Sequence, residues 1–428
     1  MNQARETTEP LFSFRNNLRR FFIQPDNQTR VLDGFRALSI LYVILFHAFY
    51  LPQPAFVDLP HFIDFVESMP AWLNWVWHGD AGVDMFFILS GFLITGLMLR
   101  EQERDGHVHV GRFYQHRILR ILPVYVFAVM IYCIPENSNR AYFWANLLFI
   151  NNFLPLEKIL IPWSWSLSIE AQFYLLFPLL FVLLVESRRP VTWLVLLFLG
   201  ATAIRYLVIL WYPELYQKAF FHHAIATPEH RPVLMFEKVY MNLYTRMGPL
   251  LLGVLMAWLY YRHHARVQGY LDRHARLASV LVVAGIGLAA AVTSVAVFNP
   301  GIERSEAFNL HYMAWYRNLF SLGMALVLFT SLFGAGLLGR LFHRVLALRL
   351  WYPIAQAAYS TYLFHIPFLA VGYYIMLDGK VDGLAQLGLA QIAGAVALAV
   401  LFSLGFSLLI YLFIERPFMN IYKRKSRK

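Results

Sequence analysis

Ionisable side chains stand inside apolar stretches of this sequence, where they are costly to bury and are therefore candidates for chemistry. Arg36 and His47 lie eleven residues apart in one such stretch, residues 31–51. Eleven residues are close to three helical turns, so both side chains are expected on one helix face, about 16 Å apart along the axis. The alternative is a structural role, with an arginine that reaches toward lipid headgroups and a histidine that caps a polar contact.

A second group of arginines begins the stretch at 117–134. Arg117 and Arg120 are three residues apart, hence on one helix face, and they are expected at the same depth as Arg36. Forked guanidinium groups bind phosphate through paired hydrogen bonds. Three arginines at one level predict an anion site, although an interfacial arginine pair can also bind only lipid phosphate.

A carboxylate, Glu170, lies in the outer half of the stretch at 165–185, at a depth similar to that of His47. A carboxylate beside an imidazole fixes its tautomer and raises its basicity, which is the arrangement of a general base. The alternative partner of Glu170 is Arg246, which enters residues 241–261 from the same side. The two pairings are compatible with each other.

Residues 82–96 place further polar groups among small residues. Asp84 near the outer mouth and Ser90 are candidates for substrate contact, whereas Gly91 and Gly96 are expected to let helices pack closely. His365 is left as a candidate core histidine.

No metal site is predicted. The single cysteine, Cys133, supplies no thiolate cluster. The loop histidines have no carboxylate partner at ligand spacing and are interpreted as solvated: His222, His223, His230, His263 and His264.

The composition indicates that these ionisable side chains lie on membrane-spanning helices. Of 428 residues, 59% are hydrophobic and 14% are charged, whereas soluble domains have about a quarter charged residues. Ten stretches are long enough to cross a hydrocarbon core of about 30 Å. They lie near 31–51, 82–99, 117–134, 165–185, 191–211, 241–261, 277–298, 311–333, 351–376 and 386–414. The prediction is an all-α polytopic bundle, and the absence of Walker and nucleophile-elbow motifs excludes soluble nucleotide-binding and hydrolase folds.

The net charge of +11 is distributed unevenly between alternate loops. One set of loops, together with both termini, holds 25 of the 36 Lys and Arg and has a net charge of about +15, and the other side nets about −6. The positive-inside rule assigns the basic side and both termini to the cytoplasm, in a multi-pass protein of the inner membrane. Because these charges belong to lipid-facing loops, nucleic acid is not predicted as a partner.

Seven motifs, in order, resemble the membrane acyltransferase-3 family of integral-membrane O-acyltransferases, which modify cell-envelope and secreted carbohydrates. They are Leu32 to Ala37 with His47, Gly82 to Thr95, Phe113 to Pro123, Trp165 to Tyr174, Arg246 with Leu252-Gly253, Tyr359 to Pro367, and Ile414 to Phe418. Two departures are Ala171, where the family usually has a second acidic residue, and Phe364-His365-Ile366 in place of a Trp-His pattern.

The resemblance implies a cytoplasmic segment at 1–30, a transmembrane domain at 31–418 and a basic tail at 419–428, as in the form without an appended esterase-like domain. It also implies a cytoplasmic acyl-CoA co-substrate, expected to be acetyl-CoA, and no permanently bound cofactor. Its phosphates would be held by Arg117 and Arg120, with Arg36 as a further contact.

The resemblance also implies roles at the reacting centre. His47 would deprotonate a sugar hydroxyl with Glu170 orienting it, or would carry the acyl group transiently. Arg246 would neutralise the developing oxyanion or bind an acidic acceptor. Asp33 would orient Arg36 rather than take part in the chemistry.

Two other functions stay open on the sequence alone. A transporter or flippase of lipid-linked saccharides would line a pathway with the same charges, although the Arg36–His47 and Arg117–Arg120 spacings do not recur in the second half. The other open function is a membrane acyltransferase that acts on a lipid or a protein. The acceptor, the acyl length and the oligomeric state are left open.

Overall fold

Helices form all the regular structure in the residues that the computed structural model describes, apart from an isolated bridge between Phe56 and Leu384. The described residues are 12–25, 29–136, 138–217, 233–297, 299, 302 and 304–425. The α-helices are α1 (Phe14–Phe22), α2 (Val31–Tyr50), α3 (Leu59–Ser68), α4 (Gly82–Asp105), α5 (Val110–Cys133), α6 (Phe143–Leu147), α7 (Trp165–Glu186), α8 (Pro190–Trp211), α9 (Glu214–Gln217), α11 (Val233–Met235), α12 (Leu243–Arg262), α13 (His264–Arg273), α14 (Ala275–Thr293), α15 (Glu306–Phe333), α16 (Gly336–Leu346), α17 (Trp351–Met376), α18 (Leu389–Ile410) and α19 (Arg416–Lys425). The predicted all-α class is confirmed.

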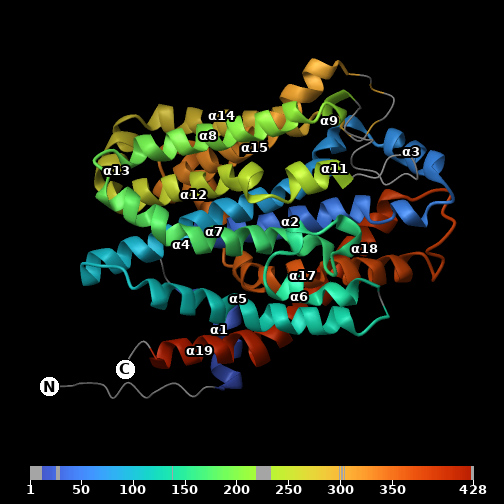
Figure 1. Cartoon of the computed structure of the whole chain (residues 1–428), viewed down its shortest axis with the longest axis horizontal. Helices are drawn as coiled ribbons and strands as arrows, with labels where there is room; N and C mark the ends of the chain where they lie inside the picture. The colour runs from blue at the N-terminus through green and yellow to red at the C-terminus, as the bar shows by residue number, and fades with distance from the viewer. Residues whose placement is uncertain are drawn as a thin grey trace.

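Shorter helical turns connect these helices at the site. A 3₁₀ segment, η2 (Ala71–Ala81), leads into α4. Two π-helical turns, η7 (Phe236–Tyr240) and η8 (Tyr411–Glu415), precede α12 and α19. Figure 1 shows the long helices running roughly along the longest axis of the molecule, with α13 at one end and α3 and α9 toward the other.

Eight helical stretches among the described residues are long and apolar enough, by length and composition, to cross a membrane. They are Val31–Ala55, Ala71–Asp105, Val110–Cys133, Pro162–Glu186, Pro190–Trp211, Ala275–Thr293, Glu306–Phe333 and Leu389–Ile421. The other two predicted stretches form the helices α12 and α17, which are not among the eight. The predicted number of ten spans is therefore not reproduced by composition.

Helices α12 and α17 carry buried polar side chains. Arg246 in α12 and Ser360, Thr361 and His365 in α17 are all buried inside the bundle. A helix that faces other helices can carry polar groups, because those groups find partners within the protein.

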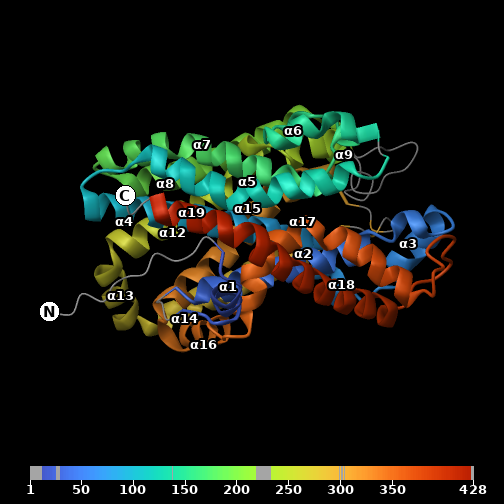
Figure 2. The same cartoon turned by 90° about the horizontal axis from the view of Figure 1, so that it is seen from below.

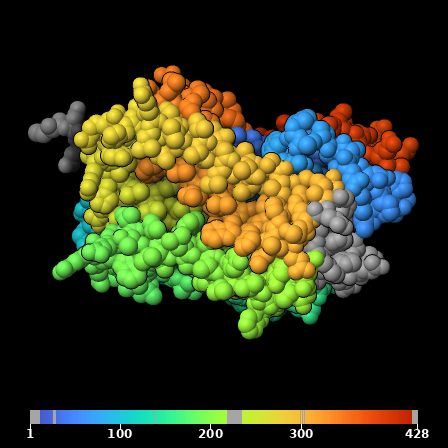
Figure 3. Space-filling model, turned by 90° about the horizontal axis from the view of Figure 1, so that it is seen from above, coloured from blue at the N-terminus to red at the C-terminus, as the bar shows by residue number. Residues whose placement is uncertain are grey.

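The outer surface of the bundle is apolar over large areas. Figure 3 shows one face, formed largely by α8 (green), α14 (yellow) and α15 (orange). Large apolar side chains are exposed on the first two of these helices: Leu196, Leu199, Leu207, Val280, Val283 and Ile286. A soluble monomer rarely exposes so continuous an apolar surface, so this face fits contact with lipid, and the chain is a multi-pass membrane protein.

Helix α4 lies at the centre of the bundle and contacts α2, α7, α12 and α15. Its closest approach is to α12, where Gly91 faces the Leu250 backbone and Gly253 faces the Ile88 backbone. A Cβ at either glycine would overlap a carbonyl oxygen of the other helix. The predicted close packing at Gly91 is confirmed, and it brings the polar end of α4 against α12.

A proline in α17 ties this helix to its neighbours. Pro367 has no N–H, so the carbonyl of Leu363 loses its partner within the helix. That carbonyl accepts hydrogen bonds from Tyr132 Oη at 2.8 Å and from Trp163 Nε1 at 3.1 Å. These bonds fix the position of His365, which lies two residues before Pro367.

Short amphipathic helices, which the sequence reasoning did not predict, border one side of the bundle. In α1, Phe21 packs on Tyr411 of η8 with ring centroids 5.1 Å apart, and Asn17 donates to the Leu412 carbonyl. Figure 2 shows α1 and α19 on the same side of the molecule. The first and last described helices thus lie close together, and the cytoplasmic placement of both termini stays a prediction.

We expect the substitution Gly91→Val to destabilise the protein by about 1–3 kcal/mol, because the new side chain would overlap backbone atoms that cannot move independently. The measurement is the unfolding midpoint of purified protein in detergent. Gly200→Ala in α8, where a Cβ meets open space, is the control and should leave the midpoint unchanged. Equal midpoints for the two variants would contradict the close approach.

Candidate active site

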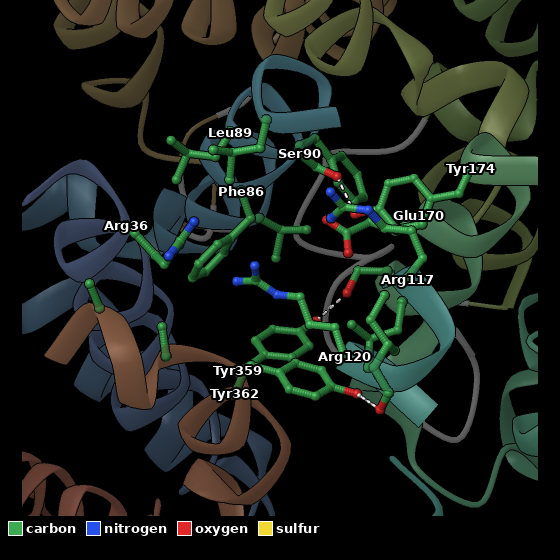
Figure 4. A pocket seen from close by; sticks show the side chains of 18 of the residues that line it. Arg36, Phe86, Leu89, Ser90, Arg117, Arg120, Glu170, Tyr174, Tyr359 and Tyr362 are labelled. Carbon is green, nitrogen blue, oxygen red and sulfur yellow. Dashed lines mark hydrogen bonds between the residues drawn. The ribbon is translucent and has the colours of Figure 1, made fainter. Parts of the chain in front are cut away.

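An inner cavity of about 140 Å³ is lined by all three arginines that the sequence predicts as an anion site, Arg36, Arg117 and Arg120. In Figure 4, Arg36 and Arg120 reach toward its centre from opposite sides. The other lining residues are mostly apolar or aromatic: Val83, Phe86, Phe87, Leu89, Ser90, Leu93, Ile121, Ser166, Leu167, Glu170, Tyr174, Ala355, Gln356, Ala358, Tyr359, Tyr362 and Glu415. Apolar walls lower the local dielectric and strengthen the attraction of these cations for an anion.

Two of these arginines are not neutralised by direct contact. Neither Arg36 nor Arg120 forms a hydrogen bond or an ion pair within the described part of the chain. Glu170 and Glu415 act on Arg36 only through longer-range electrostatics. Arg117 instead lies over the ring of Tyr174, with its guanidinium carbon 5.5 Å from the ring centroid.

Glu170 belongs to the wall of this inner cavity. Ser90 Oγ and Tyr174 Oη are 2.5 Å apart, and both hydroxyls interact electrostatically with the Glu170 carboxyl group. Arg117 and Arg120 interact electrostatically with the same group. Ser90, predicted as a substrate contact, therefore lines the cavity and also holds Glu170.

The inner cavity continues into a second opening, here called the mouth cavity, of about 270 Å³. Arg36, Arg120 and Glu415 line both spaces. Asp33 also lines the mouth cavity and accepts a hydrogen bond of 2.8 Å from Gln24 Nε2. Asp33 was predicted to orient Arg36; among the described residues the two side chains share no hydrogen bond or ion pair, and Asp33 acts on Arg36 through its charge.

A third space, the outer cavity, of about 280 Å³, contains His47. Its lining is rich in aromatic rings with a few polar groups: Phe46, Tyr50, Leu51, Trp77, His78, Asp80, Val83, Leu156, Pro162, Trp163, Trp165, Met235, Phe236, Tyr240, Met241, Tyr316, Tyr362 and Ile366. Aromatic walls with few convergent polar groups are typical of sites for organic ligands.

Val83 and Tyr362 line both the inner and the outer cavity and so form the wall between them. The Tyr362 hydroxyl is 2.7 Å from Ser166 Oγ and donates to the Trp163 carbonyl at 2.6 Å. These bonds hold the ring across the boundary. The three spaces therefore lie in series through the bundle.

The structure does not bring His47 and Glu170 together. His47 lines only the outer cavity and Glu170 only the inner one, with Tyr362 at the boundary between them. The predicted pairing is not formed, and the expected common depth of His47 and Glu170 is wrong, because Glu170 lies at the level of Arg117 and Arg120. Counting residues within one stretch does not fix how two helices are placed relative to each other. The direct partner of His47 is His365, whose Nε2 lies 3.2 Å from His47 Nδ1.

Arg246 and Asp84 belong to a buried ionic network. Arg246 Nη2 is 3.2 Å from one oxygen of Asp84, and Arg317 Nη1 is 2.9 Å from the other. Arg317 also binds Asp80, which accepts a hydrogen bond of 2.9 Å from Tyr240. Two carboxylates and two guanidinium groups balance in charge.

This network changes the interpretation of two predicted residues. Arg246 pairs with Asp84 rather than with Glu170, so the alternative ion pair of the sequence is not formed either. Neither Arg246 nor Asp84 lines any of the three cavities described above. The geometry of Arg246 and Asp84 supports a structural role. Neither residue lies where it would contact a substrate bound in these cavities.

Sequence reasoning missed three residues of the site, Asp80, Arg317 and Tyr362, and assigned no role to His365. Arg317 stands alone as a charge inside an apolar stretch, and Asp80 lies four residues before Asp84 on the way into the same helix. Both are signals of a buried charge in need of a partner. Tyr362 carries no such signal, since tyrosines are frequent throughout this chain.

Possible metal ligands come together among the described residues at the turn between α4 and α5, where Glu101, Asp105 and His109 meet. Arg112 is 3.1 Å from Glu101 and 3.5 Å from Asp105, so the carboxylates there are already paired with a cation. The loop histidines His222, His223 and His230 lie outside the described residues.

The profile of the acyltransferase domain family matches residues 30–411, which is most of the chain. The protein belongs to the membrane acyltransferase-3 family. The match covers Arg36, His47, Arg117, Arg120 and Glu170, so the family region contains the inner and outer cavities almost completely.

Curated relatives within this family carry the name O-acetyltransferase. OatA of Staphylococcus aureus strain NCTC 8325 / PS 47 is 26% identical over 372 residues, covering 80% of this chain and 51% of its own length. The putative O-acetyltransferase SACOL0978 of S. aureus strain COL is 26% identical over 254 residues, covering 54% of this chain and 34% of its own length. This acyltransferase-3 chain thus spans about half or less of the length of these relatives. No solved structure gives a significant match.

We expect Asp84→Asn to lower the unfolding midpoint strongly, by the equivalent of about 3–5 kcal/mol, because Arg246 loses its buried counter-charge. Thermal unfolding in detergent measures the effect. Asp64→Asn, an exposed carboxylate on α3, should leave the midpoint unchanged. An unchanged midpoint for Asp84→Asn together with loss of catalysis would instead assign Asp84 to the substrate.

Proposed function

We propose that this protein transfers an acetyl group from cytoplasmic acetyl-CoA to a hydroxyl of a cell-envelope or secreted carbohydrate at the outer side of the inner membrane. The observation that carries this proposal is the series of three cavities, with unpaired arginines in the inner ones and a histidine in the outer one. Family membership supports the reaction class, and the names of the relatives support acetyl transfer to oxygen.

The donor would enter through the mouth cavity. Arg36 and Arg120 line both the mouth and the inner cavity and have no hydrogen-bond or ion-pair partner among the described residues, so the phosphates of a coenzyme A ester would supply their counter-charges. The helix rise from Arg36 to His47 is about 16 Å, on the order of an extended pantetheine arm. A thioester whose phosphates sit at Arg36 would therefore reach the wall formed by Val83 and Tyr362.

The acceptor would bind in the outer cavity, beside His47. The Nε2 atom of His47 would take the proton of the acceptor hydroxyl while its oxygen attacks the thioester carbonyl carbon. The carbon–sulfur bond then breaks, the acetyl ester forms, and the thiolate of coenzyme A recovers the proton from His47. The aromatic rings and the few polar groups of this cavity suit a sugar ring with its hydroxyl groups.

The donor site predicts a binding defect. Arg36→Gln and Arg120→Gln should each raise the KM for acetyl-CoA by about 10-fold or more while changing kcat less, because each variant removes a charge-assisted phosphate contact. Initial rates with radiolabelled acetyl-CoA in proteoliposomes measure both constants. Arg344→Gln, an exposed arginine of α16, is the matched control and should behave like the wild-type protein.

Two outcomes of that assay would count against the proposal. An unchanged KM in both arginine variants would contradict a phosphate site in the inner cavity. Uptake of a lipid-linked saccharide without turnover of acetyl-CoA would favour a transporter.

The separation of His47 from Glu170 predicts different defects in their variants. His47→Ala should lower kcat by about 100-fold or more, as expected for loss of a general base. Glu170→Gln should act mainly on the KM for acetyl-CoA, since Glu170 contacts the inner cavity and its arginines. The pH profile of kcat should keep its shape in Glu170→Gln, and a changed profile would show that Glu170 acts on His47 after all.

A further inference from the structure

His365 is a fully buried histidine of α17 that contacts His47 directly. Its Nδ1 lies 2.8 Å from the carbonyl oxygen of Tyr362, and its Nε2 lies 3.2 Å from Nδ1 of His47. His47 Nδ1 in turn lies 2.9 Å from the carbonyl oxygen of Val43, one helical turn earlier in α2. The two rings meet edge to face, with centroids 4.7 Å apart.

These contacts determine where the protons lie. A carbonyl oxygen only accepts hydrogen bonds, so Nδ1 of His365 must carry a hydrogen toward Tyr362, and Nδ1 of His47 must carry one toward Val43. The short contact between the rings then requires a lone pair on Nε2 of His365, because two N–H groups would repel each other. His365 is therefore a neutral acceptor, which shares the single Nδ1–H hydrogen of His47 with the carbonyl oxygen of Val43.

The same assignment leaves Nε2 of His47 without a proton. This nitrogen has no hydrogen-bond partner within the described part of the chain. The ring lines the outer cavity, and its Nδ1 edge is occupied by Val43 and His365. The free lone pair of Nε2 is thus the atom available to an acceptor molecule.

We propose that His365 is a positioning residue, which holds His47 in the tautomer with a basic Nε2 and fixes the plane of its ring toward the outer cavity. This inference rests on the proposed function, in which His47 acts as the general base. When His47 takes up a proton at Nε2, its Nδ1–H group becomes a stronger donor, and the lone pair of His365 stabilises the resulting imidazolium. A carboxylate is not required for this role, which agrees with the distance of Glu170 from His47.

The surroundings of His365 keep its ring in place. Tyr362 stacks beside it, with centroids 5.9 Å apart and an interplanar angle of 26°. Trp163 meets its other side in an edge-on contact at 6.1 Å. Trp163 is itself held by its bond to the Leu363 carbonyl, which Pro367 leaves free. Nε2 of His365 is therefore held in place by the bonds to the Leu363 carbonyl that also connect α17 to its neighbours.

Other titratable groups also face His47 from the elements around the outer cavity. They are Tyr50 of α2, His78 and Asp80 of η2, Tyr240 of η7, Tyr316 of α15 and Tyr362 of α17. Asp80 acts on His47 through its charge, but its own hydrogen bonds go to Arg317 and Tyr240. None of these groups touches Nδ1 of His47, and His365 does.

Three variants of His365 test the proposal. In His365→Gln, the amide oxygen can occupy the place of Nε2 and accept from His47, whereas in His365→Asn it stops short, near the place of Nδ1. His365→Leu removes the acceptor altogether. We expect kcat for acetyl transfer to fall at least 10-fold in the Leu and Asn variants and to recover to within a few-fold of wild type in the Gln variant. The KM for acetyl-CoA should stay unchanged in all three.

The pH profile separates positioning from mere support of the fold. Without an acceptor, the imidazolium of His47 is less stable, so the acid limb of the kcat profile should move to lower pH in His365→Leu and return in His365→Gln. Equal losses in the Gln and Leu variants, or an unchanged acid limb in His365→Leu, would overturn the proposal. Unfolding midpoints are measured beside the rates, so that a variant that fails to fold is recognised.

The tautomer of His47 can also be measured by NMR spectroscopy, without an activity assay. The ¹⁵N resonances of His47, assigned in ¹⁵N-histidine-labelled protein in nanodiscs by their absence from His47→Ala, should report a protonated Nδ1 and an unprotonated Nε2 near neutral pH. This tautomer should be lost in His365→Leu. A protonated Nε2 in the wild-type protein would overturn the role of His365. Absence of acetyl transfer in the wild-type protein, with the expected tautomer present, would contradict only the proposed function.

Discussion

The mutual neutralisation of two buried carboxylates and two buried arginines is the interaction on which the rest of this structure depends: Asp80, Asp84, Arg246 and Arg317. An isolated charge inside a bilayer costs several kcal/mol, so these side chains must meet, and in meeting they hold α4, α12 and α15 in one arrangement. Arg317 extends the network to Asp80, beside the outer cavity. Because α4 is fixed in this way, Val83 near its start faces the boundary between the inner and outer cavities.

Against this balanced network, the arginines of the inner cavity stand out by their lack of partners. Arg36 and Arg120 are surrounded by largely apolar walls and have no direct counter-ion within the described residues. The carboxylates and guanidinium groups of the network pair with one another, whereas Arg36 and Arg120, which face the inner cavity, have no such pairing among the described residues. This difference is the basis for proposing that Arg36 and Arg120 bind a phosphorylated ligand. The inner cavity with these arginines and the outer cavity with His47 share Tyr362 in their linings.

The class of fold and the approximate helices could be predicted from the sequence, because about 20 consecutive apolar residues are a local property that the bilayer thickness fixes. All ten predicted stretches form long helices. The common level of Arg36, Arg117 and Arg120 was predictable for the same reason, since each lies near the end of its stretch. The reaction class was predicted from motifs that follow the order of a known family, and no single residue predicted it as well.

The sequence by itself thus determined the helices, their membrane character and the common level of the three arginines Arg36, Arg117 and Arg120. Only the tertiary structure decided which groups meet. His47 pairs with His365 rather than with Glu170, and Arg246 pairs with Asp84. The order of residues along one helix follows from counting, but the relative depth of two helices and the direction of a side chain depend on the placement, rotation and crossing of whole helices. Those are set by contacts between distant segments, such as Gly91 against the backbone at Leu250, which no single stretch of sequence contains.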